Sequence, residues 1–223
     1  GACQFTAQLA GAVLVAIGWK APQLFVAIAV AHLICLSLVA ITIGNPSTEK
    51  RESDPFSFGE WFGVFRVANF RLVWFGRFLV SMGVGIMTTF GVFFLSDVIK
   101  RFTAGSLKLD TGEQAAGVVI MVIAITGAIS AWSAGKLADR FDRRKLASMA
   151  TLIMCCAIFP FAFAGTYAQI LSLAVVFGLG YGAYGSSDWA LAADVMPDEE
   201  SLGRDLGIWQ ASIAAPQFFT GLV

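Results

Sequence analysis

A short polar stripe inside an apolar segment is the feature of this sequence best suited to binding chemistry. Tyr181, Tyr184 and Asp188 stand at i, i+3 and i+7, which places them on one face of a helix. A carboxylate within a membrane-spanning segment costs about 2.5–3.5 kcal/mol to insert, so it usually faces a cavity or a partner. We take these residues as candidates for binding a polar ligand or an ion. The alternative is that Asp188, near the end of its span, reaches the lipid head groups or pairs with Arg77.

A second stripe comprises Arg77, Ser81, Gly85 and Thr88, at i, i+4, i+8 and i+11 of one helical face. Arg77, Ser81 and Thr88 join the candidates, although we interpret Arg77 as a long side chain that reaches the membrane surface. His32 is the only histidine and lies in the middle of an apolar block. A proton relay is one interpretation of it, and a polar packing residue is the favoured one.

Other kinds of chemistry find no support in the sequence. We see no metal-ligand cluster, no Ser/His/Asp arrangement and no phosphate loop, so we expect neither an enzyme, nor a metal, nor a cofactor. The run 180–185 (GYGAYG) matches a dinucleotide-binding spacing but lacks the strand that this motif requires. Gly178 and Gly182 instead favour close helix packing in lipid. We interpret the four cysteines as small buried hydrophobic residues.

The elements that carry these stripes are long apolar blocks. Hydrophobic residues make up 57% of the 223 residues, charged residues 13%, and mean hydropathy is +0.76. The blocks are about 18–26 residues long, which is enough for a helix to cross a hydrocarbon layer of ~30 Å. We predict an all-α polytopic transmembrane bundle with five complete spans and a partial one at each end. The blocks cover roughly 1–18, 22–44, 72–97, 114–134, 146–165, 168–193 and 206–223. Because the first and last blocks are cut short, we expect an internal piece of a longer polypeptide.

Residues 45–56 (NPSTEKRESDPF) form the only sustained polar linker. We therefore expect 1–44 to contain the last helices of one bundle, 45–71 to form a central linker, and 72–223 to form a second, truncated bundle. Aromatic residues at helical spacing within the linker predict an amphipathic helix at the membrane surface, with a frayed start of the next span as the alternative. They are Phe58, Trp61, Phe62 and Phe65.

Charge predicts the orientation. If the connectors 45–71, 135–145 and 194–205 share one side, that side holds most of the lysines and arginines of the loops. The excess of basic residues on the cytoplasmic side of membrane proteins then predicts that these three connectors are cytoplasmic. Net charge is zero and no basic tract is interleaved with aromatics, so we expect a lipid environment and no nucleic acid.

The connector 135–145 (GKLADRFDRRK) resembles the loop signature Gly-x-x-x-Asp-Arg-x-Gly-Arg-Arg of the major facilitator superfamily. The matching positions are Gly135, Asp139, Arg140, Arg143 and Arg144. Asp142 departs from the pattern, because the family usually has glycine there. A turn with Asp at this position does not easily adopt the positive φ that glycine provides.

The stretch 194–207 (DVMPDEESLGRDLG) is similar to another loop of the same family. The residues that carry this similarity are Asp194, Pro197, Gly203, Arg204 and Gly207. On this register the chain runs from late helix 5 to early helix 11 of a twelve-helix protein, and the two polar stripes fall on helices 7 and 10, which line the family's central cavity.

The resemblance implies a membrane transporter that works by alternating access. Asp139 would then be a conformational latch, with Arg140 and Arg143 as braces and Gly135 allowing close helix approach. Arg144, Asp194, Gly203 and Arg204 complete the latch residues. The alternative is a basic loop that sets the orientation of the chain and does not switch. The implied substrate is a small polar solute. A loose similarity of 188–197 (DWALAADVMP) to glycoside and sucrose carriers narrows it to a sugar moved with a proton or cation. The alternative is a facilitator-like subunit that does not transport and that assembles with protein partners, as in photosynthetic pigment–protein complexes.

Overall fold

The computed structural model describes residues 14, 21–42, 59, 62–138, 141–196 and 202–220. Helices account for nearly all of the described chain. In order, the elements are α2 (Ala21–Thr42), the 3-10 helix η1 (Phe62–Arg66), α4 (Ala68–Phe94), the π-helix η2 (Leu95–Ile99), the strands β1 (Phe102–Ala104) and β2 (Leu107–Leu109), α5 (Gly112–Ala138), α6 (Arg143–Phe161), α7 (Tyr167–Val195) and α8 (Leu202–Thr220).

The predicted all-α transmembrane bundle is confirmed. Within the described residues, five helices are long and apolar enough to cross a membrane, and they match the five complete blocks of the sequence. They are Phe25–Thr42, Ala68–Ile99, Gly112–Ala138, Arg143–Phe161 and Tyr167–Val195. Observed helix ends differ from the blocks by a few residues, since polar residues at the membrane surface extend α4 and α5 beyond their apolar cores.

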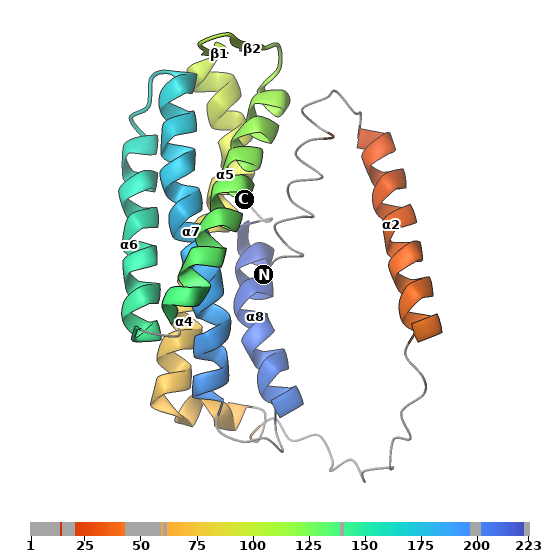
Figure 1. Ribbon diagram of the computed structural model, residues 1–223, viewed down its shortest axis with the longest axis vertical. Helices are drawn as coiled ribbons and strands as arrows, with labels where there is room; N and C mark the ends of the chain where they lie inside the picture. The colour runs from red at the N-terminus through yellow and green to blue at the C-terminus, as the bar shows by residue number, and fades with distance from the viewer. Residues whose placement is uncertain are drawn as a thin grey trace.

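Helices α5 and α7 form the closest contact of the bundle, because glycines remove the side chains at their crossing. A Cβ on Gly182 would overlap the backbone of Gly127, and a Cβ on Gly178 would overlap the Thr126 hydroxyl. This is the small-residue packing predicted for the two glycines of α7. Helix α6 packs on the other side of α7, and α8 packs along α4. Helix α2 stands apart from this bundle (Figure 1).

One end of the bundle gathers the start of α4, α6 and α8 and the end of α5 and α7 (Figure 1). We call it the basic end, because seven described lysines and arginines lie on or next to these helix termini. They are Arg66, Arg71, Lys136, Arg143, Arg144, Lys145 and Arg204. The three connectors that the charge pattern assigned to one side therefore leave the bundle at the same end.

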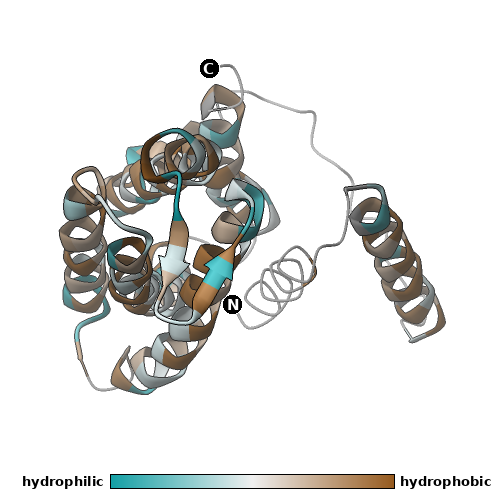
Figure 2. Ribbon diagram, turned by 90° about the horizontal axis from the view of Figure 1, so that it is seen from above, coloured by the Kyte–Doolittle hydropathy of each residue, from teal (hydrophilic) through white to brown (hydrophobic). Residues whose placement is uncertain are grey.

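A two-stranded antiparallel hairpin covers the opposite end of the bundle (Figure 2). The hairpin was not predicted from the sequence, although its two-residue loop begins with Gly105, whose φ is +62°, and a glycine at this position is a known hairpin signal. Phe102 of β1 is 7% exposed, and its ring centroid lies 6.0 Å from that of Tyr167. The Tyr167 hydroxyl donates a hydrogen bond to the Ala115 carbonyl at 2.9 Å. Phe102 therefore packs the hairpin on α7, and the hydrogen bond of Tyr167 joins α7 to α5.

Two smaller expectations differ from the structure. The amphipathic segment of the linker is described only from Phe62 to Arg66, where it is a single 3-10 turn; Phe58 and Trp61 lie outside the described residues. Cys35, Cys155 and Cys156 are exposed, not buried. In a membrane-spanning bundle an apolar residue has no need of a protein core, because the lipid around it is as apolar as the interior.

Candidate functional site: a buried charged centre between α4, α7 and α8

Three helices bring polar side chains to one level of the bundle. Counted from the basic end, Arg77 is nine residues into α4, Asp188 seven residues into α7, and Trp209 seven residues into α8. At a rise of 1.5 Å per residue, all three lie about 10–14 Å from that end. A capping box of Thr166 and Gln169 starts α7 at its far end, and the helix runs unbroken to Val195. The polar residues therefore meet within the bundle.

Arg77 and Asp188 form a buried ion pair. The distance between Arg77 Nε and Asp188 Oδ2 is 3.0 Å, and the side chains are 3% and 7% exposed. The Tyr184 hydroxyl donates to Asp188 Oδ1 at 3.3 Å. Both carboxylate oxygens therefore have a partner, as a charge removed from water requires. Asp188 is therefore paired with Arg77, as one of the alternatives drawn from the sequence had it.

The guanidinium of Arg77 also joins α4 to α8. Nη1 donates to the Trp209 carbonyl at 3.3 Å, and Nη2 donates to Gln210 Oε1 at 3.4 Å. The guanidinium carbon lies 4.6 Å from the ring centroid of Trp209 and 5.7 Å from that of Trp189, within the range of cation–π attraction. Each guanidinium nitrogen thus has an acceptor, and two indoles flank the group.

This geometry overturns our interpretation of Arg77 as an arginine that reaches the membrane surface. Its side chain is buried because an acid on α7 and two acceptors on α8 replace the water that it would otherwise seek. The periodic spacing on α4 could show only that Arg77 faces one side of the helix. Which acid it meets depends on how α4 packs against α7.

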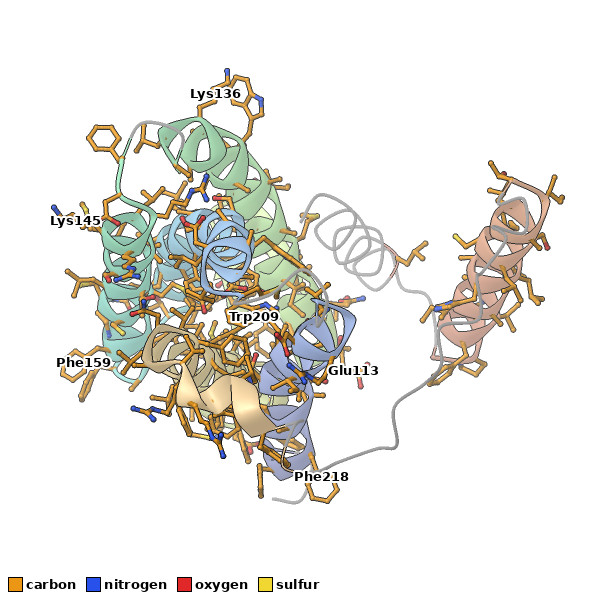
Figure 3. All side chains as sticks on the ribbon, turned by 90° about the horizontal axis from the view of Figure 1, so that it is seen from below. Glu113, Lys136, Lys145, Phe159, Trp209 and Phe218 are labelled. Carbon is orange, nitrogen blue, oxygen red and sulfur yellow. The ribbon has the colours of Figure 1, made fainter. Side chains whose placement is uncertain are left out.

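Trp209 carries a donor without a partner. It is completely buried, and Nε1 has no hydrogen-bond acceptor among the described residues. Figure 3 shows it inside the bundle, whereas Lys136, Phe159 and Phe218 project outward. Buried indole N–H groups usually find a partner. Among the described residues, Trp209 Nε1 is therefore a buried side-chain donor without an acceptor.

The other candidates lie elsewhere on their helices. Tyr181 lies one turn away on α7, where its ring stacks on Phe177 with centroids 5.9 Å apart. Ser81 is half-buried on α4, one turn beyond Arg77. The Thr88 hydroxyl donates to carbonyls of its own helix. His32 is exposed on α2, with Nδ1 2.8 Å from the Ile28 carbonyl oxygen. The structure thus brings together Arg77, Asp188 and Tyr184.

Trp189, Trp209 and Gln210 were missed by the sequence analysis. Gln210 is a polar residue within the apolar block at 206–223, and this signal could have placed it among the candidates. The two tryptophans carry no such signal, because indoles are common in apolar blocks. Only the crossing of α4, α7 and α8 shows that they flank the guanidinium.

A second charged contact lies at the basic end and joins two of the predicted latch residues. Arg143 Nη1 lies 2.7 Å from Asp194 Oδ1, and it also donates to the Ala190 carbonyl at 3.4 Å. The two side chains are 38% and 50% exposed, so this pair is hydrated, unlike the pair inside the bundle. It ties the start of α6 to the end of α7. Asp139 and Arg140 lie outside the described residues.

Asp142, which departs from the family signature, is the N-cap of α6. Its φ is −58°, and its side chain accepts a hydrogen bond from the Arg144 backbone N–H at 2.9 Å. The turn therefore needs no positive φ here, and a carboxylate also favours the positive end of the helix. This explains why Asp is acceptable where the family usually has glycine.

The remaining latch candidates have local roles in the structure. Gly135 lies within α5, and a Cβ at this position would meet nothing within 4 Å among the described residues. No described helix therefore approaches it closely. Gly203 lies in the first turn of α8. Arg204 Nε lies 3.0 Å from Oδ1 of the fully buried Asp205.

Within the described residues, no group of His, Cys, Asp and Glu could hold a metal ion.

Comparisons with known proteins agree with this architecture. A family model described as Major Facilitator Superfamily matches residues 4–220. The multi-drug resistance efflux pump PmrA of Streptococcus pneumoniae is 27% identical over 147 residues, 66% of this chain and 35% of the relative. A probable 4-methylmuconolactone transporter of Cupriavidus pinatubonensis is 32% identical over 98 residues, 44% of this chain and 23% of the relative. The matches therefore span about a third or less of each relative's length. No solved structure matches the chain.

Proposed function

The chain belongs to the Major Facilitator Superfamily, and on that basis we propose that the protein is a membrane transporter that moves a small polar solute by alternating access. The observation that carries this proposal is the Arg77–Asp188 pair, which lies 3% and 7% exposed inside the bundle. Two buried charges are a costly way to hold helices together, since an apolar pair of similar volume often stabilises a protein as well or better. Ionisable groups within a membrane more often serve transport.

In this mechanism Asp188 is the coupling residue. While it is paired, its negative charge neutralises Arg77 and the helices α4 and α7 stay joined. When a proton neutralises Asp188, the attraction is lost and Arg77 is free to interact with a solute. The titratable side chains that contact Asp188 within the described residues are Arg77 and Tyr184. Movement of the solute is thereby linked to movement of a proton.

The basic end supplies the second part of the mechanism. We propose that it faces the cytoplasm, because the cytoplasmic loops of membrane proteins carry the excess of Lys and Arg. The exposed Arg143–Asp194 pair would hold α6 and α7 together in one conformation and release them in the other. Asp139 keeps its proposed role as the latch between the two halves.

The identity of the solute is a separate question. A sugar stays a prediction, and neither relative is named as a sugar carrier: one is named as a drug efflux pump and the other as a methylmuconolactone transporter. Both names are those of transporters, which supports a transporter over an enzyme.

Transport can be tested in proteoliposomes that contain the full-length protein. Three radiolabelled probes would represent three classes of solute: lactose, benzoate and tetraphenylphosphonium. A pH gradient of one unit, imposed in either direction, supports about tenfold accumulation or extrusion of a solute that moves with one proton. We expect gradient-driven movement of at least one probe, and we expect Asp188→Asn to abolish it while the protein stays folded.

The matched control is Asp97→Asn, since Asp97 is an exposed acid in η2, which follows the end of α4 opposite to the basic end. It should transport as the wild type does. Unchanged gradient-driven transport in Asp188→Asn would refute the coupling role. A maleimide that cannot cross the membrane separates a transporter from a static assembly subunit: a cysteine at Gln210 should react from opposite sides as the gradient is reversed, and labelling from one side under all conditions would refute alternating access.

A further inference from the structure

The donors around Arg77 outnumber the acceptors. The guanidinium, the Tyr184 hydroxyl and the Trp209 indole all donate, whereas Asp188 is the only anion in contact with Arg77 among the described residues. Trp209 Nε1, completely buried, has no described acceptor. A ligand that satisfies this donor must supply an oxygen acceptor. A carboxylate does so best, because it also pairs with the guanidinium through two parallel hydrogen bonds.

The centre has an accessible flank. Arg77 and Trp209 are buried, but the residues beside the guanidinium are not: Trp189 is 45% exposed and Gln210 is exposed. Gln210 holds Nη2 through a single bond of 3.4 Å. On this flank the guanidinium is therefore held by a flexible, exposed side chain.

An apolar surface continues from the charged centre into the bundle. Val80, Val84 and Met87 of α4 and Tyr181 of α7 are half-buried and pack against a buried cluster of Met154 and Ala157 of α6 and Phe177 of α7. These residues lie one to three turns deeper than Arg77 and Asp188. A ligand whose head group lies at Arg77 would meet this surface with the rest of its body, and the surface offers aliphatic and aromatic contacts rather than the many hydrogen-bond partners that a sugar requires.

We propose that the solute bound at Arg77 is a small amphipathic organic acid. Its carboxylate pairs with Arg77 and accepts the Trp209 N–H, and its apolar body lies along the surface formed by α4 and α7. This inference rests on the proposed transport function and names the substrate class of that site. The carboxylate takes the place of Asp188, and Asp188 accepts a proton from the aqueous phase, so one organic anion and one proton move together and the buried site keeps its charge balance.

Trp209→Phe is the most informative variant, because it removes the orphan N–H and keeps an aromatic ring beside Arg77. Binding would be measured by calorimetry on the detergent-solubilised full-length protein, with benzoate, cyclohexanecarboxylate and octanoate as probes. Benzyl alcohol, which has the ring of benzoate without its charge, is the control ligand. We expect at least one of the three acids to bind and benzyl alcohol to bind about tenfold more weakly or not at all. Trp209→Phe should weaken the binding of that acid about 10- to 100-fold, as expected for the loss of a hydrogen bond to a charged group.

Trp132→Phe is the control variant, since Trp132 is 70% exposed on α5, away from the centre. It should bind the acid with wild-type affinity. Equal affinity for benzyl alcohol and benzoate, no binding of any of the three acids, or wild-type affinity in Trp209→Phe would each overturn the organic-acid proposal. These results are separate from the transport test. Gradient-driven movement of lactose or tetraphenylphosphonium without acid binding leaves transport standing and refutes the substrate class. Acid binding without gradient-driven movement of the acid that binds, tested in the same proteoliposomes, supports the site and refutes transport.

Discussion

Two Arg–Asp pairs, each with its acid on α7, offer a direct test of how burial changes the contribution of an ion pair to stability. Arg77–Asp188 is 3% and 7% exposed at 3.0 Å, and Arg143–Asp194 is 38% and 50% exposed at 2.7 Å. At an effective dielectric constant of ~20, the attraction in the buried pair is about 5.5 kcal/mol. Desolvation offsets much of that gain, but removal of one partner leaves a buried unpaired charge, which costs about 3–5 kcal/mol. The hydrated pair is worth about 0–1 kcal/mol.

Double-mutant cycles measure both values in the full-length protein. One cycle combines Arg77→Gln with Asp188→Asn, and the other combines Arg143→Gln with Asp194→Asn. Unfolding of the protein in mixed micelles by increasing SDS, followed by tryptophan fluorescence, gives the free energy of unfolding of each variant. We expect the buried pair to show a coupling free energy of about 2–3 kcal/mol, and the exposed pair one below ~0.5 kcal/mol.

The double variant is the decisive member of the buried cycle. Arg77→Gln alone leaves Asp188 without its cation, and Asp188→Asn alone leaves Arg77 without its anion, so each should be less stable than the variant in which both charges are removed. Equal coupling in the two cycles, within about 0.5 kcal/mol, would refute the reasoning from burial. The reasoning would also be wrong if each single variant at the buried pair lowered the free energy of unfolding by less than ~1 kcal/mol.

Three further predictions concern the packing that holds the site, each measured by the same unfolding assay. Gly182→Ala should lower the free energy of unfolding by about 1–3 kcal/mol, because its Cβ would overlap the backbone of Gly127. Gly185→Ala is the control, since a Cβ there would meet nothing within 4 Å. Equal stability of the two variants would contradict the contact. Tyr167→Phe should cost about 1 kcal/mol through the lost hydrogen bond to the α5 carbonyl; no change would mean that the bond does not stabilise this end. Asp142→Ala should cost about 0.5–2 kcal/mol by removing the N-cap of α6, whereas Asp142→Asn, which keeps a capping oxygen, should cost much less.

Much of the fold could be predicted from the order of residues along the chain. The length of each apolar block follows from the thickness of the bilayer, and the charges between blocks predict which helix termini share one end. A close helix contact at Gly182 was also predicted, because glycines spaced four apart permit close helix approach in lipid, but the partner helix α5 was not. The hairpin was not predicted, since a single Gly-Ser loop between two three-residue strands is a weak signal beside long apolar blocks.

The candidate site shows where sequence reasoning ends. Periodicity placed Tyr184 and Asp188 on one face of a helix, because that relation is local and repeats every 3.6 residues. Whether Asp188 met water, a ligand or Arg77 depended on residues more than a hundred positions apart in the chain, and no local pattern contains that information. The sequence by itself determined the spans, their alternation and the helix faces that carry charge. The tertiary structure decided that Arg77 is buried and paired, and that Trp209 lies beside it with an unpartnered N–H, because only the crossing of α4, α7 and α8 places these side chains within reach of one another.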